Sequence, residues 1–107
     1  MKIKVWNIEA ITGYKPITTF YEDFSIADRF GYNAVRDTFR RGWKTAKFLG
    51  HKEMTEFAMV LNWKIMEHYE SNPTLAEVYQ DLWMEIDELL RDTLKGEEKD
   101  YYLRTTD

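Results

Sequence analysis

The sequence predicts a mainly α protein: a small bundle of about four helices with a short N-terminal β-hairpin, at the margin of the α+β class. Apolar residues recur at helical spacing over most of the chain after residue 19. Glycine, proline and helix-capping residues divide this pattern into segments. The first 19 residues instead combine apolar–polar alternation with a turn signal, which is typical of paired strands.

The range 2–19 is the expected hairpin. Ile3 and Val5 alternate with lysines, and Thr12 precedes a glycine that signals a turn. Residues 17–19 would return as the second strand. Because an isolated hairpin is only marginally stable in water, we expect it to pack against the helices.

The first helix is expected over residues 19–30. Thr19 fits the N-cap position and Glu22 follows three residues later, which together form a capping box. Ser25 is an alternative cap for a shorter helix. Gly31 is suited to end this helix, because glycine adopts the left-handed conformation common just after a helix.

The second helix is expected over residues 33–48, with Asn33 as its N-cap. Gly42 lies on the apolar face one turn before Ala46, which indicates a close helix crossing at this point. The opposite face of the helix is basic. Together with Arg29 just upstream, it provides the candidate interaction surface: Arg29, Arg36, Arg40, Arg41, Lys44 and Lys47.

The third and fourth helices are expected over residues 53–70 and 73–95. The apolar arc of the range 53–70 is wider than a surface helix needs, so we expect it to be the central helix of the bundle. Asn72 and Pro73 are suited to the N-cap and first position of the last helix. The tail 96–107 is expected to begin in solvent and to fold back on the bundle through Tyr101, Tyr102 and Leu103.

The composition is that of one folded domain. The chain has 107 residues, of which 44% are hydrophobic, enough to fill a core at this length. It has no cysteine, which excludes disulfides, thiolate zinc sites and cysteine nucleophiles. It also has no apolar run of about 18 residues and no pattern of a signal peptide, so we expect no membrane association and a cytoplasmic location.

Charge is distributed unevenly along the chain. The net charge is −4, but residues 1–27 are neutral overall, residues 28–52 carry +5 and residues 53–107 carry −9. A chain with this polarity has either an internal complement for its charges or a charged partner.

Three interpretations of the basic surface remain open. It can be solvated or paired with the acidic face of the last helix. It can also bind a protein partner, with two apolar residues on the polar arc of the third helix, Val60 and Trp63, as further contacts. This partner can be a second copy of the chain in a homodimer, or a host or phage protein. Finally, it can neutralise nucleic-acid phosphates. A helix-turn-helix outline exists, but Asp37 and Arg40 occupy positions that are usually apolar in a recognition helix.

The sequence offers little for catalysis or metal binding. It contains no nucleophile elbow, phosphate-binding loop or dinucleotide fingerprint. A di-iron bundle site needs an acid three residues before a histidine, and Ile65 is found three residues before His68. His68 is expected to be a partly buried, hydrogen-bonded side chain. We therefore expect no catalytic, cofactor-binding or metal-binding residues and no enzymatic activity.

Several stretches resemble a family of small uncharacterised proteins from phages, prophages and mobile elements of Gram-positive and gut bacteria. These stretches are TTFYEDFSIADRFG (18–31), AVRDTF (34–39), TEFAMVLNWKIMEHYE (55–70), LAEVYQDLWMEID (75–87) and LKGEEKDYYLRTTD (94–107). The resemblance implies no catalytic residue, because the family has no known activity. It implies a bacterial cytoplasmic accessory protein that acts by protein–protein interaction; a nucleic-acid-binding module is the alternative.

Overall fold

The computed structural model describes residues 16–106, which form five α-helices and no strand. The helices are α2 (Pro16–Ala27), α3 (Tyr32–Leu49), α4 (His51–His68), α5 (Pro73–Thr93) and α6 (Gly96–Thr106). The predicted mainly α class is confirmed. The predicted count of about four helices is wrong, because the C-terminal tail is helical as well.

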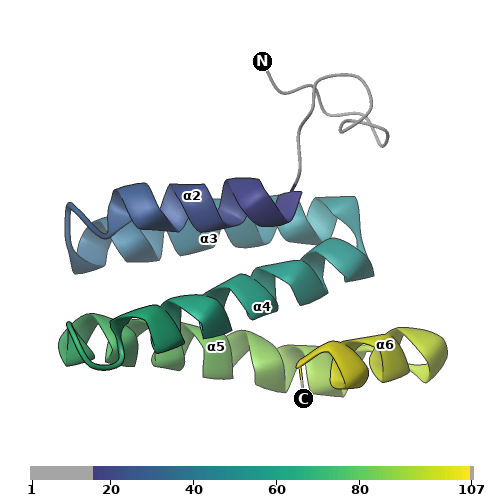
Figure 1. The fold of residues 1–107 in the computed structure, drawn as a ribbon. Helices are drawn as coiled ribbons and strands as arrows, with labels where there is room; N and C mark the ends of the chain where they lie inside the picture. Colours follow the sequence, from purple (N-terminus) through teal and green to yellow (C-terminus); the bar gives the residue numbers. More distant parts are fainter. Residues whose placement is uncertain (1–15, 107) are drawn as a thin grey trace.

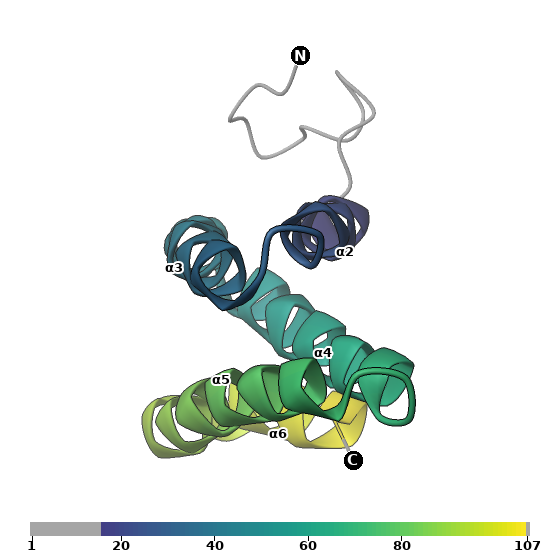
Figure 2. The same ribbon diagram turned by 90° about the vertical axis from the view of Figure 1, so that its left-hand side faces the viewer.

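Helix α4 is the central element of the bundle. Helices α2 and α3 lie side by side on one side of α4, and α5 and α6 lie on the other (Figure 1, Figure 2). Each of these four helices contacts α4. The position predicted for this helix from its wide apolar arc is therefore confirmed.

The part of the core between α4 and the pair α2 and α3 is an aromatic cluster around Phe57 of α4. Its ring centroid lies 5.0–5.7 Å from four other rings, contributed by α2 and α3: Phe20, Phe24, Phe39 and Trp43. Gly42 lets α3 approach this cluster closely. A Cβ atom at Gly42 would lie 2.6 Å from Cε1 of Phe57, so the predicted close helix crossing is present.

The predicted hairpin is wrong where the structure describes it. Residues 17–19, expected as the second strand, belong to α2, which begins at Pro16. Proline fits the first turn of a helix because its missing N–H has no partner there in any case. Phe20 and Phe24, four residues apart, then bring one face of α2 into the core. The other predicted hairpin residues, 2–15, lie outside the described residues.

Most of the predicted helix boundaries differ from the observed ones by one to three residues. Helix α2 ends at Ala27 rather than at residue 30, and a turn leads to Gly31, whose φ of 98° only glycine adopts easily. Gly50, with φ 133°, separates α3 from α4. The start of α5 agrees with the prediction: the Asn72 side chain accepts a hydrogen bond from the Leu75 backbone N–H at 3.3 Å.

The tail folds back on the bundle as helix α6, rather than as an extended segment. Tyr102 is fully buried, and its hydroxyl donates a hydrogen bond to the carboxylate of Asp87 on α5. The ring of Tyr101 lies edge-on to His51 at the start of α4, with centroids 5.7 Å apart. The predicted docking of the tail through its tyrosines is therefore confirmed. Within residues 16–106, no helix has the length and apolar composition needed to cross a bilayer.

Candidate functional site

A polar network lies inside the protein, at the point where the end of α2 meets α4 and α5. Its centre is Lys64 of α4, which is fully buried. The ammonium nitrogen of Lys64 lies 2.7 Å from Oδ2 of Asp28 and 2.8 Å from Oε2 of Glu67. It also donates a hydrogen bond to the hydroxyl of Ser25 at 3.1 Å. All three polar contacts of the buried ammonium are therefore made within the chain, as a desolvated charge requires.

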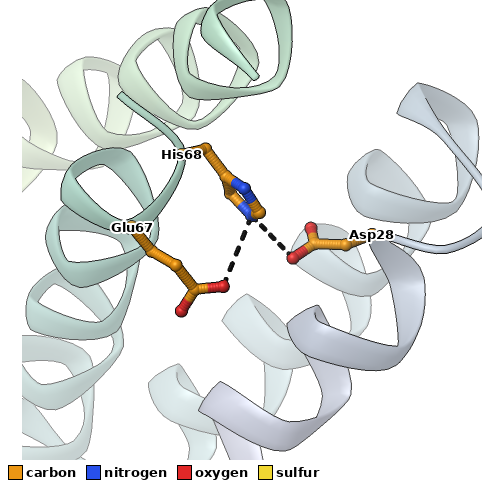
Figure 3. Close-up of side chains that lie close together, drawn as sticks. All are labelled: Asp28, Glu67 and His68. Atoms are coloured by element: carbon orange, nitrogen blue, oxygen red, sulfur yellow. Dashed lines mark hydrogen bonds and ion pairs between the residues drawn. The ribbon is translucent and has the colours of Figure 1, made fainter. Parts of the chain in front are cut away.

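A second layer of side chains completes the network. Nε2 of His68 lies 2.8 Å from Oδ2 of Asp28 and 3.6 Å from Oε2 of Glu67, and Figure 3 shows the three side chains converging. The hydroxyl of Tyr79 donates to the other oxygen of Asp28, and that of Tyr21 donates to Glu67. The rings of His68 and Tyr79 stack almost in parallel, with centroids 5.8 Å apart. The predicted partly buried, hydrogen-bonded histidine is confirmed.

The network stabilises the charged forms of Lys64 and Glu67. Burial alone would lower the pKa of Lys64, but the hydrogen bonds and negative charges of Asp28 and Glu67 outweigh burial and raise it. Burial alone would raise the pKa of Glu67, but its hydrogen bonds with Lys64 and Tyr21 lower it. Burial, together with the hydrogen bond to Asp28, raises the pKa of Tyr79. At neutral pH, Lys64 is therefore an ammonium ion and Tyr79 a neutral phenol.

The same cluster contains three groups of the kinds that ligate metals. One ligand atom from each of Asp28, Glu67 and His68 lies within 4.8 Å of the others. However, the ammonium of Lys64 already contacts both carboxylates at 2.7–2.8 Å, so it occupies the position that a cation would take. A divalent ion bound there would have to displace a buried positive charge that belongs to the chain. These residues therefore do not fit a metal site.

The network is also poorly suited to catalysis. Lys64 is fully buried, and it lines neither the groove between α2 and α3 nor the groove beside α6. A protonated lysine lacks the lone pair that a nucleophile or general base needs. The arrangement instead fastens the end of α2 to α4 and α5. The prediction that the chain is not an enzyme stays a prediction.

Sequence reasoning identified neither this network nor the burial of its central residue, Lys64. A signal for its burial was present. Phe57, Leu61, Lys64 and His68 follow one another at spacings of four, three and four residues, the repeat of a core-facing stripe. A lysine within such a stripe that is followed by an acid three residues later indicates a buried lysine that can form an ion pair with this acid on the same helix.

The predicted basic surface is exposed along its whole length. Its members are all solvent-accessible: Arg29, Arg36, Arg40, Arg41, Lys44 and Lys47. Arg40 forms an ion pair of 2.7 Å with Asp37 in its own helix, and Arg41 donates a hydrogen bond to Thr38. Among residues 16–106, no salt bridge joins this surface to the acidic face of α5. The interpretation in which the two faces pair within one chain is therefore wrong for the described residues.

A groove between α2 and α3 adjoins the basic surface. It has a volume of about 680 Å³ and combines apolar side chains, including Ile26 and Phe30, with the arginines Arg40 and Arg41. Phe30 is 75% exposed and Ile26 53%. Large exposed apolar side chains next to charged ones are typical of protein-binding surfaces. Sequence reasoning did not assign these two residues to the interaction surface.

The two predicted apolar contacts on α4 have different outcomes. Trp63 is 43% exposed, so it is available at the surface. Val60 is fully buried, and its prediction as a surface contact is wrong. The reason is that α4 has neighbours on both sides, which bury a residue that a helical wheel places on the polar arc.

Comparisons with protein-family models, curated proteins and solved structures found no match. The phage or mobile-element resemblance therefore stays an expectation. Functional inference rests on the surface and on the chemistry of its residues.

Proposed function

We propose that the chain is a non-enzymatic accessory protein that acts by binding another protein through α3 and the adjacent groove. In keeping with the resemblance described above, we assign it to a phage or mobile element and to the bacterial cytoplasm. The binding surface consists of the basic stripe of α3, defined as Arg36, Arg40, Lys44 and Lys47, and of the groove residues Ile26 and Phe30.

The observation that supports this proposal most strongly is the lack of a countercharge. Of the four stripe cations, only Arg40 has an acidic partner among the described residues, and that pair is solvent-exposed. Exposed pairs contribute only about 0–1 kcal/mol, so the pair leaves the guanidinium free to exchange partners. The exposed ring of Phe30 beside the charges favours a protein surface over a phosphate backbone, because aromatic and arginine side chains dominate protein interfaces.

A co-purification experiment tests this function. The tagged chain is incubated with lysate of a bacterial host, with and without nuclease, and compared with the double variant Arg40→Glu/Lys44→Glu. Lys52→Glu/Lys95→Glu is the matched control, because it makes the same charge change at exposed residues outside the stripe. We expect a protein that is retained after nuclease by the wild type and the control and lost with the stripe variant. Equal retention by all three forms contradicts the proposal.

Nucleic-acid binding is the second candidate function. The stripe spans 12 residues of α3, about 16 Å along the helix axis, so all four cations can contact phosphates at once. Four such contacts give a slope of about −4 for the logarithm of duplex affinity against the logarithm of salt concentration. A flat salt dependence, or retained duplex binding by Arg40→Glu/Lys44→Glu, argues against this candidate.

A further inference from the structure

Helix α5 carries an acidic stripe with the same spacing as the basic stripe of α3. The cations of α3 lie at 36, 40, 44 and 47, and the exposed acids of α5 lie at 77, 81, 85 and 88. Both sets therefore follow i, i+4, i+8 and i+11, which places each set within an arc of about 80° on its helix. The acidic stripe is defined as Glu77, Asp81, Glu85 and Glu88.

The flanking apolar residues match as well. Phe48 follows the first cation of α3 by twelve residues, and Leu89 follows the first acid of α5 by twelve. Both side chains are exposed, as is Met84 within the acidic stretch. Each stripe therefore combines four charges of one sign with an exposed apolar side chain at the same relative position.

The acidic stripe faces away from the core of its own chain. The buried face of α5 is formed by residues such as Tyr79, Ile86 and Leu90, on the other side of the helix. Helices α3 and α5 lie on different sides of α4 (Figure 2). No salt bridge of the described residues connects the two stripes, so each is available to another molecule.

We propose that the basic stripe of α3 binds the acidic stripe of α5 of a second copy of this chain. This inference rests on the proposed function, since it names the partner of the same α3 surface. Equal spacing lets four opposite charges face each other while Phe48 and Leu89 lie at the edge of the contact. Because the contact joins two different surfaces, repeating it produces a ring or an open chain of copies rather than only a symmetric pair.

Sedimentation velocity of the full chain at several protein concentrations tests self-association. We expect the average mass to rise with concentration at about 20 mM salt and to return to that of a monomer at about 500 mM, where exposed charges are screened within a few ångströms. Wild-type protein that stays monomeric at every concentration in low salt overturns the inference.

A charge exchange tests the pairing itself. The variant Arg40→Glu/Lys44→Glu replaces the two central cations of the basic stripe by acids, and Asp81→Lys/Glu85→Lys replaces the two central acids of the acidic stripe by cations, so each variant alone brings like charges together at the centre of the contact. Each is expected to be monomeric alone, whereas an equimolar mixture associates again because opposite surfaces are restored. The control Glu22→Lys/Glu70→Lys reverses two exposed acids outside the stripe and is expected to associate like the wild type. Association of either stripe variant alone, or its absence from the mixture, overturns the pairing.

The two proposals fail in distinguishable ways. Circular dichroism confirms that each variant is folded before it is used. If the wild type does not self-associate but Arg40→Glu/Lys44→Glu still loses a captured lysate protein, the inference is overturned and the proposed function stands. If neither self-association nor capture depends on the stripe, both are overturned.

Discussion

Replacing Lys64 by methionine removes the central cation of the buried network while keeping a side chain of similar length. The ammonium contacts Asp28 at 2.7 Å and Glu67 at 2.8 Å, and none of it is accessible to solvent. Breaking a buried pair by removing one partner typically costs about 3–5 kcal/mol. Glu67 is partly exposed and gains water, and Asp28 keeps its contacts with His68 and Tyr79. We therefore expect a loss at the lower end, about 3 kcal/mol.

Such a loss is measurable in a folded protein. A domain of this size has a free energy of unfolding of about 5–15 kcal/mol, so the variant is expected to fold at 25 °C. Its Tm is expected to fall by roughly 10–20 °C. Urea unfolding followed by circular dichroism gives the free energy directly, provided that the slope against urea is unchanged.

A double-mutant cycle with Asp28→Asn identifies the cause. If Lys64 and Asp28 form the pair described here, the two single losses do not add, and the coupling energy exceeds about 1 kcal/mol. The control pairs Lys64→Met with Asp92→Asn, which removes an exposed acid far from the network and is expected to be additive. A loss below about 1 kcal/mol for Lys64→Met, or additivity with Asp28→Asn, would refute the reasoning.

Three further predictions concern the core and the ionised network. Gly42→Ala gains about 1 kcal/mol of helix propensity, but its Cβ would lie 2.6 Å from Cε1 of Phe57. Because overpacking a filled core costs about 1–3 kcal/mol, we expect a net loss of stability, and a urea midpoint higher than that of the wild type would contradict it. Tyr102→Phe removes the hydrogen bond to Asp87 and is expected to destabilise the protein by about 1–2 kcal/mol; an unchanged Tm would show that α6 does not depend on this contact. The pKa of Glu67 is lowered in the folded state, so ionised Glu67 stabilises the fold above its unfolded pKa of about 4.3, and this stabilisation is lost as pH falls through the lower folded pKa. We therefore expect the stability of Glu67→Gln to depend less on pH than that of the wild type between about pH 5 and pH 3. Acid unfolding of Glu67→Gln with the full pH dependence of the wild type would contradict this prediction.

Helix positions were predictable from the sequence because apolar spacing and capping residues act locally. Asn72 and Pro73 set the start of α5, and the wide apolar arc of α4 identified the central helix. The N-terminal prediction failed because residues 17–19 were interpreted as the second strand of a hairpin. Pro16 instead fits the first position of α2, and the burial of Phe20 stabilises that helix. Local rules do not determine which of these outcomes packing favours.

The network could not be assembled from sequence because its partners are far apart in the chain. Lys64 and Asp28 are separated by 36 residues, and Tyr79 comes from a third helix. A helical wheel treats a lysine as solvated and has no information on an acid from another element. Val60 shows the same limitation for an apolar residue: its burial depends on the helices on either side of α4.

The buried charges and the surface charges of this protein have opposite surroundings. Inside, the ammonium of Lys64 has two carboxylates within 2.8 Å. Outside, the basic stripe of α3 and the acidic stripe of α5 each place like charges three or four residues apart. Like-charged neighbours at this spacing destabilise a helix by about 0.2–0.5 kcal/mol per pair. Each stripe has three such neighbours, so a single chain carries roughly 1 kcal/mol of repulsion in each helix. A surface of opposite charge relieves this repulsion on both helices, and this gain adds to the attraction between the stripes when two copies meet.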